Sequence, residues 1–171
     1  MRASFLFILP VALVLSGCLG GFHVAETPAR EPLFRPETFF AGATSGEGIL
    51  SVRGKADRPF RVASTGQSGS DGTFVLDQTI TYADGKVERR SFRMRPVDEH
   101  RYTGRLTGAS GIVSGRAEGN GFHLRYTIRK PAVTMEQWIY LQPNGRTSLN
   151  RGTVRILGVP VAHLSETIRR Q

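Results

Sequence analysis

An alternation of apolar and polar side chains over residues 122–129 is the clearest pattern in the chain. Phe122, Leu124, Tyr126 and Ile128 alternate with polar residues. Successive side chains of a strand point to opposite faces, so this period of two predicts a strand that is buried on one side. Shorter or weaker versions of the pattern predict further strands over residues 49–52, 60–62, 73–82, 87–95, 102–107, 134–141, 147–156 and 159–168.

Two turn sequences separate these runs. Asp84-Gly85 follows residues 73–82, and Pro143-Asn144-Gly145 lies between residues 134–141 and 147–156. Glycine after Asp or Asn is typical of the tight turns in β-hairpins. The last run is predicted to be a strand, although Leu164 and Ile168 are four residues apart and would also suit a terminal helix.

About nine or ten short antiparallel strands with almost no helix predict an all-β sandwich or barrel. We favour a barrel, because closure removes the edge strands that would otherwise promote aggregation. A barrel that spans an outer membrane is not expected, since its outward face would place Arg125, Arg129 or Glu136 in lipid.

The N-terminus predicts where the protein is located. Arg2 precedes an apolar run over residues 3–15, and the tetrapeptide Leu15-Ser16-Gly17-Cys18 follows. A positive residue, about a dozen apolar residues and small residues before the cleavage site are typical of a secretory signal. With Cys18 in place, residues 1–17 are predicted to be a bacterial lipoprotein signal peptide. The alternative is an ordinary secretory signal with an incidental cysteine.

We expect Cys18 to carry a thioether-linked diacylglycerol and its freed amine a third chain, because two or more acyl chains anchor a protein stably. Leu19 follows the cysteine where an Asp would favour retention in the inner membrane. The expected location is therefore the periplasmic face of the outer membrane. Three prolines predict that residues 18–37 form the lipidated N-terminus and a flexible tether, with the barrel domain at 38–171.

Three phenylalanines near this boundary, Phe34, Phe39 and Phe40, are expected to plug one end of the domain rather than line a site. The chain has 171 residues, a formal net charge of +9 and one cysteine. It therefore lacks an internal disulfide. A basic surface suits anionic headgroups or lipopolysaccharide phosphates, and a solvated surface without a specific partner explains the charge equally well. We expect a monomer that does not bind nucleic acid.

Patterns typical of catalysis or metal binding are weak. No two of the four histidines have zinc-ligand spacing. No complete Gly-x-Ser-x-Gly motif, phosphate loop or dinucleotide fingerprint occurs. We therefore expect no catalytic residues, no metal and no cofactor, and an enzyme is the least favoured class.

Several short motifs follow one another in a characteristic order. They are Phe39-Phe40-Ala41-Gly42, Leu76-Asp77, Tyr82-Ala83-Asp84-Gly85 with Arg89-Arg90, Arg125-Tyr126, Gln137-Trp138-Ile139-Tyr140-Leu141-Gln142 and Leu149-Asn150-Arg151. Together they resemble an uncharacterised family of proteobacterial lipoproteins known as domain of unknown function 3833. The resemblance covers most of the mature chain, and its most distinctive piece is the tryptophan segment. It implies a lipocalin-like (calycin-like) barrel and no established activity; the frequent proximity of such genes to lipid-modifying genes supports a lipid role.

Charged residues inside the predicted strands are candidates for ligand binding, although on a wet face they would serve only solubility. If some point inward, Asp77 and Glu136 with Arg125 and Arg151 would form a polar network in the lumen, because buried charges must be paired. Adjacent residues face opposite sides, so at most one of Arg125 and Tyr126 lines the lumen. The candidate ligand-binding residues are Asp77, Arg90, Tyr126, Glu136, Trp138 and Arg151.

Trp138, the only tryptophan in the chain, is predicted to lie at the ligand pocket. Glu136 and Trp138 would then share one face of their strand, with Gln137 on the other. An indole suits the boundary between an acyl chain and a polar headgroup. The alternative is a core tryptophan that closes the barrel floor.

Two classes of function remain. The first is a lipid-anchored periplasmic protein whose barrel binds or carries a lipid or another hydrophobic small molecule. The second is a structural or interaction protein of the envelope that docks a protein partner or lipopolysaccharide. An internal cavity large enough for an acyl chain would favour the first class. A filled barrel with an exposed apolar patch would favour the second.

Overall fold

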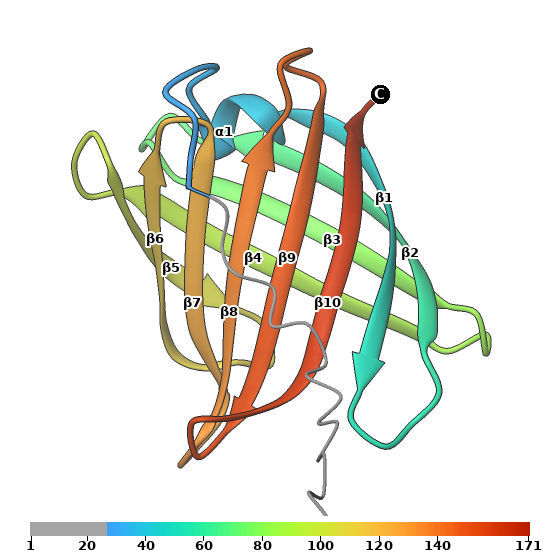
Figure 1. Cartoon of the computed structure of the whole chain (residues 1–171). Coiled ribbons are helices and arrows are strands. Elements are labelled where there is room, and N and C mark those ends of the chain that lie inside the picture. Colours follow the sequence, from blue (N-terminus) through green and yellow to red (C-terminus); the bar gives the residue numbers. More distant parts are fainter. Residues whose placement is uncertain (1–26) are drawn as a thin grey trace, which may run out of the picture.

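The computed structural model describes residues 27–171 as a short helix followed by ten strands that close into an antiparallel barrel (Figure 1). Cys18 and the predicted signal peptide lie outside the described residues. The elements are α1 (Pro36–Phe39), β1 (Gly42–Val52), β2 (Arg58–Ser68), β3 (Phe74–Tyr82), β4 (Val87–Pro96), β5 (Arg101–Leu106), β6 (Ser110–Glu118), β7 (Gly121–Arg129), β8 (Val133–Leu141), β9 (Thr147–Ile156) and β10 (Val159–Arg170).

Each strand pairs with its neighbours in sequence, and β1 pairs with β10 to close the sheet. Closure leaves no strand edge of the barrel unpaired, so the barrel has no exposed edge that could promote aggregation. Among residues 27–171, no helix is long and apolar enough to cross a membrane.

The predicted period of two is confirmed along β7, where Phe122, Leu124 and Tyr126 are buried and Arg125 is exposed. Both predicted hairpin turns form, and their glycines adopt the left-handed backbone with φ of 82° at Gly85 and 64° at Gly145. The last run is a strand, β10, and no terminal helix forms. Its hydrogen bonds to β1 and β9 outweigh the weak helical spacing.

Aromatic side chains fill the end of the barrel near α1. Phe34 is fully buried and stacks on Phe122 with ring centroids 5.6 Å apart. Phe39 and Phe40 meet edge to face at 4.9 Å. A side chain at Gly66 would overlap the carbonyl of Phe40, so the glycine lets the chain after α1 lie directly on β2. The three phenylalanines therefore plug this end.

The described part of the predicted tether packs on the barrel. The Phe34 amide donates to the Gly119 carbonyl at 2.8 Å, and the Asn120 amide donates to the Ala29 carbonyl at 2.8 Å. The prolines do keep this segment out of regular structure until α1. Burial of Phe34 shows that the chain already packs on the barrel before residue 38.

Candidate functional site

A ring of polar side chains crosses the lumen about midway along the strands. On β3, Gln78 occupies the inward position between Leu76 and Ile80, which belong to two separate apolar clusters. On β10, Glu166 occupies the inward position between Leu164 and Ile168. We call this ring the polar belt, and its members are Ser64, Gln78, Arg90, Gln137, Asn150 and Glu166.

One half of the polar belt is centred on Arg90. Its Nε atom donates to Oε1 of Gln78 at 2.9 Å, and Nε2 of Gln78 donates to the Ser64 hydroxyl at 3.2 Å. The guanidinium carbon lies 5.5 Å from the centre of the Phe92 ring. Within residues 27–171, Arg90 forms no salt bridge, and its Nη1 and Nη2 atoms have no hydrogen-bond partner. Arg90 is therefore a half-buried cation without a salt-bridge partner among these residues.

The other half is centred on Glu166, which is buried. Nδ2 of Asn150 donates to Oε2 of Glu166 at 2.9 Å, and Nε2 of Gln137 donates to Oδ1 of Asn150 at 3.3 Å. Burial raises the pKa of the Glu166 carboxyl, while the Asn150 hydrogen bond and the charge of Arg90 act in the opposite direction. A side chain at Gly46 would overlap Oε1 of Glu166, so the glycine on β1 makes room for this carboxyl group.

A small cavity lies between the polar belt and the aromatic plug. Its volume is about 50 Å³, which is room for water molecules but not for an acyl chain. One wall is formed by the polar belt, and the other walls are apolar. They comprise Pro36, Phe40, Phe74, Leu76, Phe92, Met94, Phe122, Leu124, Ile139 and Ile168.

A larger recess of about 270 Å³ adjoins α1. It shares Pro36, Phe74 and Met94 with the cavity, and it borders the exposed residues Ser68 and Gly72. The Phe74 and Met94 side chains therefore lie between the recess and the cavity. A methionine side chain is unbranched and changes its shape easily, and Met94 lines both spaces.

At the rim of the recess, the Tyr102 hydroxyl lies 3.2 Å from Oε2 of Glu37, a distance at which it donates a hydrogen bond. Burial raises the pKa of Tyr102 to about 12, and the charge of Glu37 acts in the same direction. The hydroxyl therefore stays protonated and holds α1 to β5. Of the residues described, no group of three or more His, Cys, Asp or Glu side chains is placed to hold a metal ion.

The structure separates the six candidate residues into two sets. Arg90 and Tyr126 point into the lumen, where Tyr126 is buried and meets Phe92 edge to face at 6.1 Å. Asp77 lies on the outer face of β3 and lines a surface groove of about 660 Å³, to which Arg90 also contributes. Glu136, Trp138 and Arg151 also lie outside the barrel, so the predicted lumen network of Asp77, Glu136, Arg125 and Arg151 does not form.

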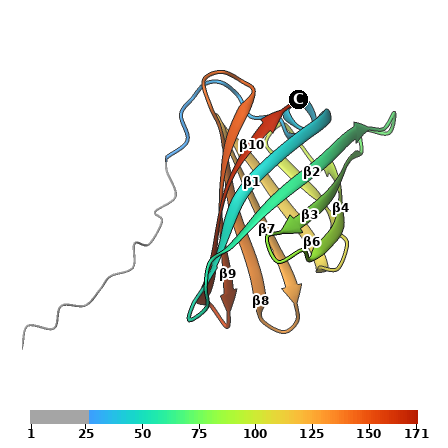
Figure 2. The same cartoon turned by 90° about the vertical axis from the view of Figure 1, so that its right-hand side faces the viewer.

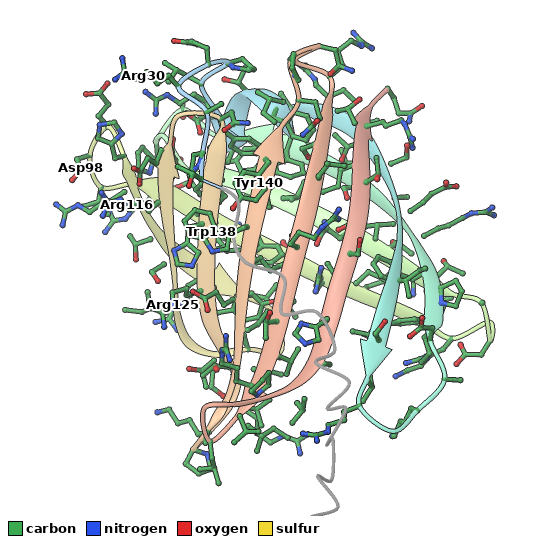
Figure 3. The ribbon with its side chains drawn as sticks, in the orientation of Figure 1. Arg30, Asp98, Arg116, Arg125, Trp138 and Tyr140 are labelled. Atoms are coloured by element: carbon green, nitrogen blue, oxygen red, sulfur yellow. The ribbon has the colours of Figure 1, made fainter. Side chains whose placement is uncertain are left out.

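Trp138 lies on the outer face of β8, where Figure 3 shows it beside Tyr140. The His123 ring stacks on it with centroids 4.1 Å apart, and Nε2 of His123 lies 2.8 Å from Oε1 of Glu136. Glu136 and Trp138 thus share one face, as the period of two requires, and Gln137 points into the lumen. Trp138 consequently belongs neither to the lumen nor to the core.

The candidate set omitted most of the polar belt. Gln78 and Gln137 each occupy the apolar phase of their strands, between Leu76 and Ile80 or between Met135 and Ile139. A polar residue at a position where the alternation of the strand calls for a buried apolar one is the signal that could have identified them. Charge alone was a poor guide, because most charged side chains in these strands face solvent.

Comparisons with known proteins agree with this architecture. A model of the family "Protein of unknown function (DUF3833)" matches residues 12–170. No curated protein matches the chain.

Three solved structures have a similar fold. The S-type phycobiliprotein lyase CPES from Guillardia theta has a TM-score of 0.62 and 8% identity, covering 79% of this chain and 90% of the lyase. Rv2717c from M. tuberculosis has a TM-score of 0.63 and 16% identity, and the match covers 81% of this chain and 99% of Rv2717c. A protein of unknown function from the DUF3598 family of Nostoc punctiforme has a TM-score of 0.60 and 13% identity. The match covers 87% of this chain and 54% of that protein. The fold is therefore a lipocalin-like, calycin-type barrel.

The environment of Glu166 predicts how stability depends on pH. The unfolded chain releases this proton near pH 4.5, whereas the folded chain keeps it to a higher pH. The contribution of Glu166 to stability is therefore fully present below about pH 4.5, and it is lost as the pH rises through the pKa of the folded state. Glu166→Gln stays neutral and keeps an acceptor for Asn150, so its stability advantage over the parent should grow with pH.

Urea unfolding at about pH 4 and about pH 8 measures this difference. Glu47→Gln, at an exposed position on β1, is the matched control and should show little change. An advantage of Glu166→Gln that is the same at both pH values would contradict the described environment of Glu166.

Proposed function

The chain belongs to the DUF3833 family of proteins of unknown function, and we propose that it is a lipid-anchored envelope protein whose barrel binds an acidic amphiphile. The acidic group of this ligand contacts Arg90 in the polar belt. Its apolar part extends between Phe74 and Met94 toward the recess beside α1. The protein holds or carries this molecule and does not convert it.

The unpaired state of Arg90 is the observation that carries the proposal. A half-buried cation without a salt-bridge partner is partly desolvated, so an anionic ligand at this position would lower the free energy of the complex. The two terminal nitrogens of a guanidinium match the two oxygens of a carboxylate or phosphate. Because Nε of Arg90 is held by Gln78, the terminal nitrogens are the ones that remain for a ligand.

The charge on the opposite side of the lumen supports an acidic ligand. An ionised Glu166 would repel it, but burial raises the pKa of this carboxyl and so reduces its negative charge. Asn150 and Gln137 can form hydrogen bonds to the ligand without adding charge. The polar belt thus combines one cation with uncharged amides and a carboxyl group whose pKa is raised by burial.

The shape of the lumen supports an apolar chain, provided that Met94 moves. The cavity alone is far below the roughly 300–1,000 Å³ of typical ligand sites. Joined to the recess of about 270 Å³, it would give a passage with apolar walls from the polar belt to the surface beside α1. Ligand binding therefore includes a rearrangement of Met94.

The anchor is the second part of the proposal. Cys18, with Ser16 and Gly17 before it and Leu19 after it, would carry the acyl chains and place the protein on the periplasmic face of the outer membrane. Residues between Cys18 and Ala29 would then connect the anchor to the barrel. An envelope protein that docks lipopolysaccharide or a protein partner is the second candidate function. The exposed apolar side chains of Ile156, Leu157 and Val159 favour a surface contact, and their small area suits a lipid surface better than a protein.

The role of Arg90 predicts a preference for acids over alcohols. Palmitic acid should bind at least about tenfold more tightly than hexadecanol, because a hydrogen bond to a charged group contributes roughly 1.5–3 kcal/mol. Arg90→Met should remove this preference. Arg93→Met, on the outer face of the same strand, should keep it. Displacement of the neutral fluorophore N-phenylnaphthylamine from the purified full chain measures both affinities.

If neither compound displaces the probe, the lumen does not bind such molecules and the proposed function fails. Equal affinity for acid and alcohol in the parent would preserve a hydrophobic site but remove the role of Arg90.

The anchor predicts the distribution of the protein in cells. Cys18→Ala removes the only thiol in the chain and should shift the protein out of the acylated pool of the outer membrane. Metabolic labelling with a palmitate analogue followed by fractionation measures both properties. Ser16→Ala, which keeps a small residue before the cysteine, is the control. A Cys18→Ala variant that still incorporates the label would contradict acylation at this residue.

A further inference from the structure

An apolar turn protrudes from the end of the barrel opposite α1. It connects β9 to β10, and we call its residues Ile156, Leu157, Gly158 and Val159 the apolar tip. The exposed fractions of the three side chains are 45% for Ile156, 78% for Leu157 and 54% for Val159. Figures 1 and 2 show this turn at the same end as the β1–β2 turn and far from the C-terminus. Its side chains therefore project into solvent rather than into the core.

The backbone of the apolar tip is unusual for its sequence. Leu157 has φ of 50° and Gly158 has φ of 81°, and Leu157 is the only non-glycine residue with a positive φ in residues 27–171. Such turns normally use Asn, Asp or Gly at the first position. The Leu157 side chain gains little from packing because most of it is exposed. Neither turn geometry nor the core explains a leucine here.

Cations surround the apolar tip. The Leu157 amide donates to the Ala132 carbonyl at 3.0 Å, which brings the β7–β8 turn against it. Arg129, Lys130 and Arg155 flank this contact, and none of them forms a salt bridge within the part of the chain that the structure describes. The neighbouring β1–β2 turn adds Arg53 and Lys55, with Asp57 as its one acidic residue.

The turns at the opposite end of the barrel have mixed charge, because Asp98, Glu99 and Glu118 form salt bridges with Arg101, Arg35 and Arg116. The β2–β3, β4–β5 and β6–β7 connections carry acidic residues at or beside the turn, namely Asp71, Asp98, Glu99 and Glu118. The β8–β9 turn carries Arg146. Acidic residues thus neutralise part of the positive charge at that end, whereas no salt bridge among residues 27–171 involves Arg129, Lys130 or Arg155 beside the apolar tip.

We infer that this end of the barrel docks on an anionic lipid bilayer. The apolar tip inserts among the headgroups, while Arg129, Lys130 and Arg155 contact lipid phosphates. Apolar side chains next to cations are the composition of segments that lie in a membrane interface, where each Lys or Arg adds electrostatic attraction. A protein partner is the poorer match, because a single narrow turn offers far less area than a stable protein interface buries. The inference does not depend on the lumen site.

A fluorophore in the apolar tip tests this inference in the full chain. Trp138→Phe removes the only native tryptophan, and Leu157→Trp then places a single indole in the apolar tip. With vesicles of phosphatidylcholine and phosphatidylglycerol, its emission should shift to the blue, and brominated acyl chains should quench it. Vesicles of phosphatidylcholine alone should have a much smaller effect.

Val97→Trp in the same background is the matched control, because Val97 is 57% exposed in a turn at the opposite end. Its emission should not respond to either vesicle. Replacing Lys130 and Arg155 with Gln should reduce quenching at the apolar tip severalfold. Equal quenching at both positions, or no quenching at position 157, would overturn the inference. Charge-dependent vesicle binding without quenching would also overturn it and would assign the basic turns to an acidic partner.

In an independent measurement that keeps Trp138 and uses Cys18→Ala to remove the acyl anchor, Leu157→Ser should reduce co-sedimentation with the same anionic vesicles, whereas Val97→Ser should not. Equal sedimentation of the two variants would contradict docking through the apolar tip.

Discussion

Pairing of β1 with β10 is the constraint on which the rest of the structure depends. Because the sheet is closed, inward side chains near the middle of the strands are shielded from solvent by the barrel wall. Polar groups in the lumen must therefore find partners among one another. The hydrogen bonds from Gln137 through Asn150 to Glu166 satisfy this requirement across three neighbouring strands. Arg90 forms such a hydrogen bond only through Nε. Its two terminal nitrogens are therefore the atoms to which we assign the proposed ligand.

The period of two explains both the success and the limit of prediction from sequence. Alternation along β7, the two glycine turns and the run that becomes β10 were enough to predict an all-β barrel. They did not assign charged residues to the correct face. Trp138 occupies the same phase as the polar residues of its strand and lies outside, whereas Gln137 occupies the phase of Met135 and Ile139. The identity of a residue was a weaker indicator of its position than its phase.

Two features depend on contacts that no local pattern contains. Phe34 enters the core because the segment before α1 forms hydrogen bonds with the β6–β7 turn, more than eighty residues away in sequence. The space for the Glu166 carboxyl exists because Gly46 on β1 faces it from the strand that closes the barrel. Both ends of the barrel are thus specialised. The α1 end is filled by aromatic rings and holds the recess, and the other end carries the apolar tip.

A crystal structure of the full chain with bound palmitate would test the central claim most directly. We expect the carboxylate to lie within hydrogen-bonding distance of Nη1 or Nη2 of Arg90, Met94 to have left its position between the cavity and the recess, and the acyl chain to run toward α1. A palmitate molecule bound only outside the barrel, with Met94 in place and Arg90 unchanged, would contradict it.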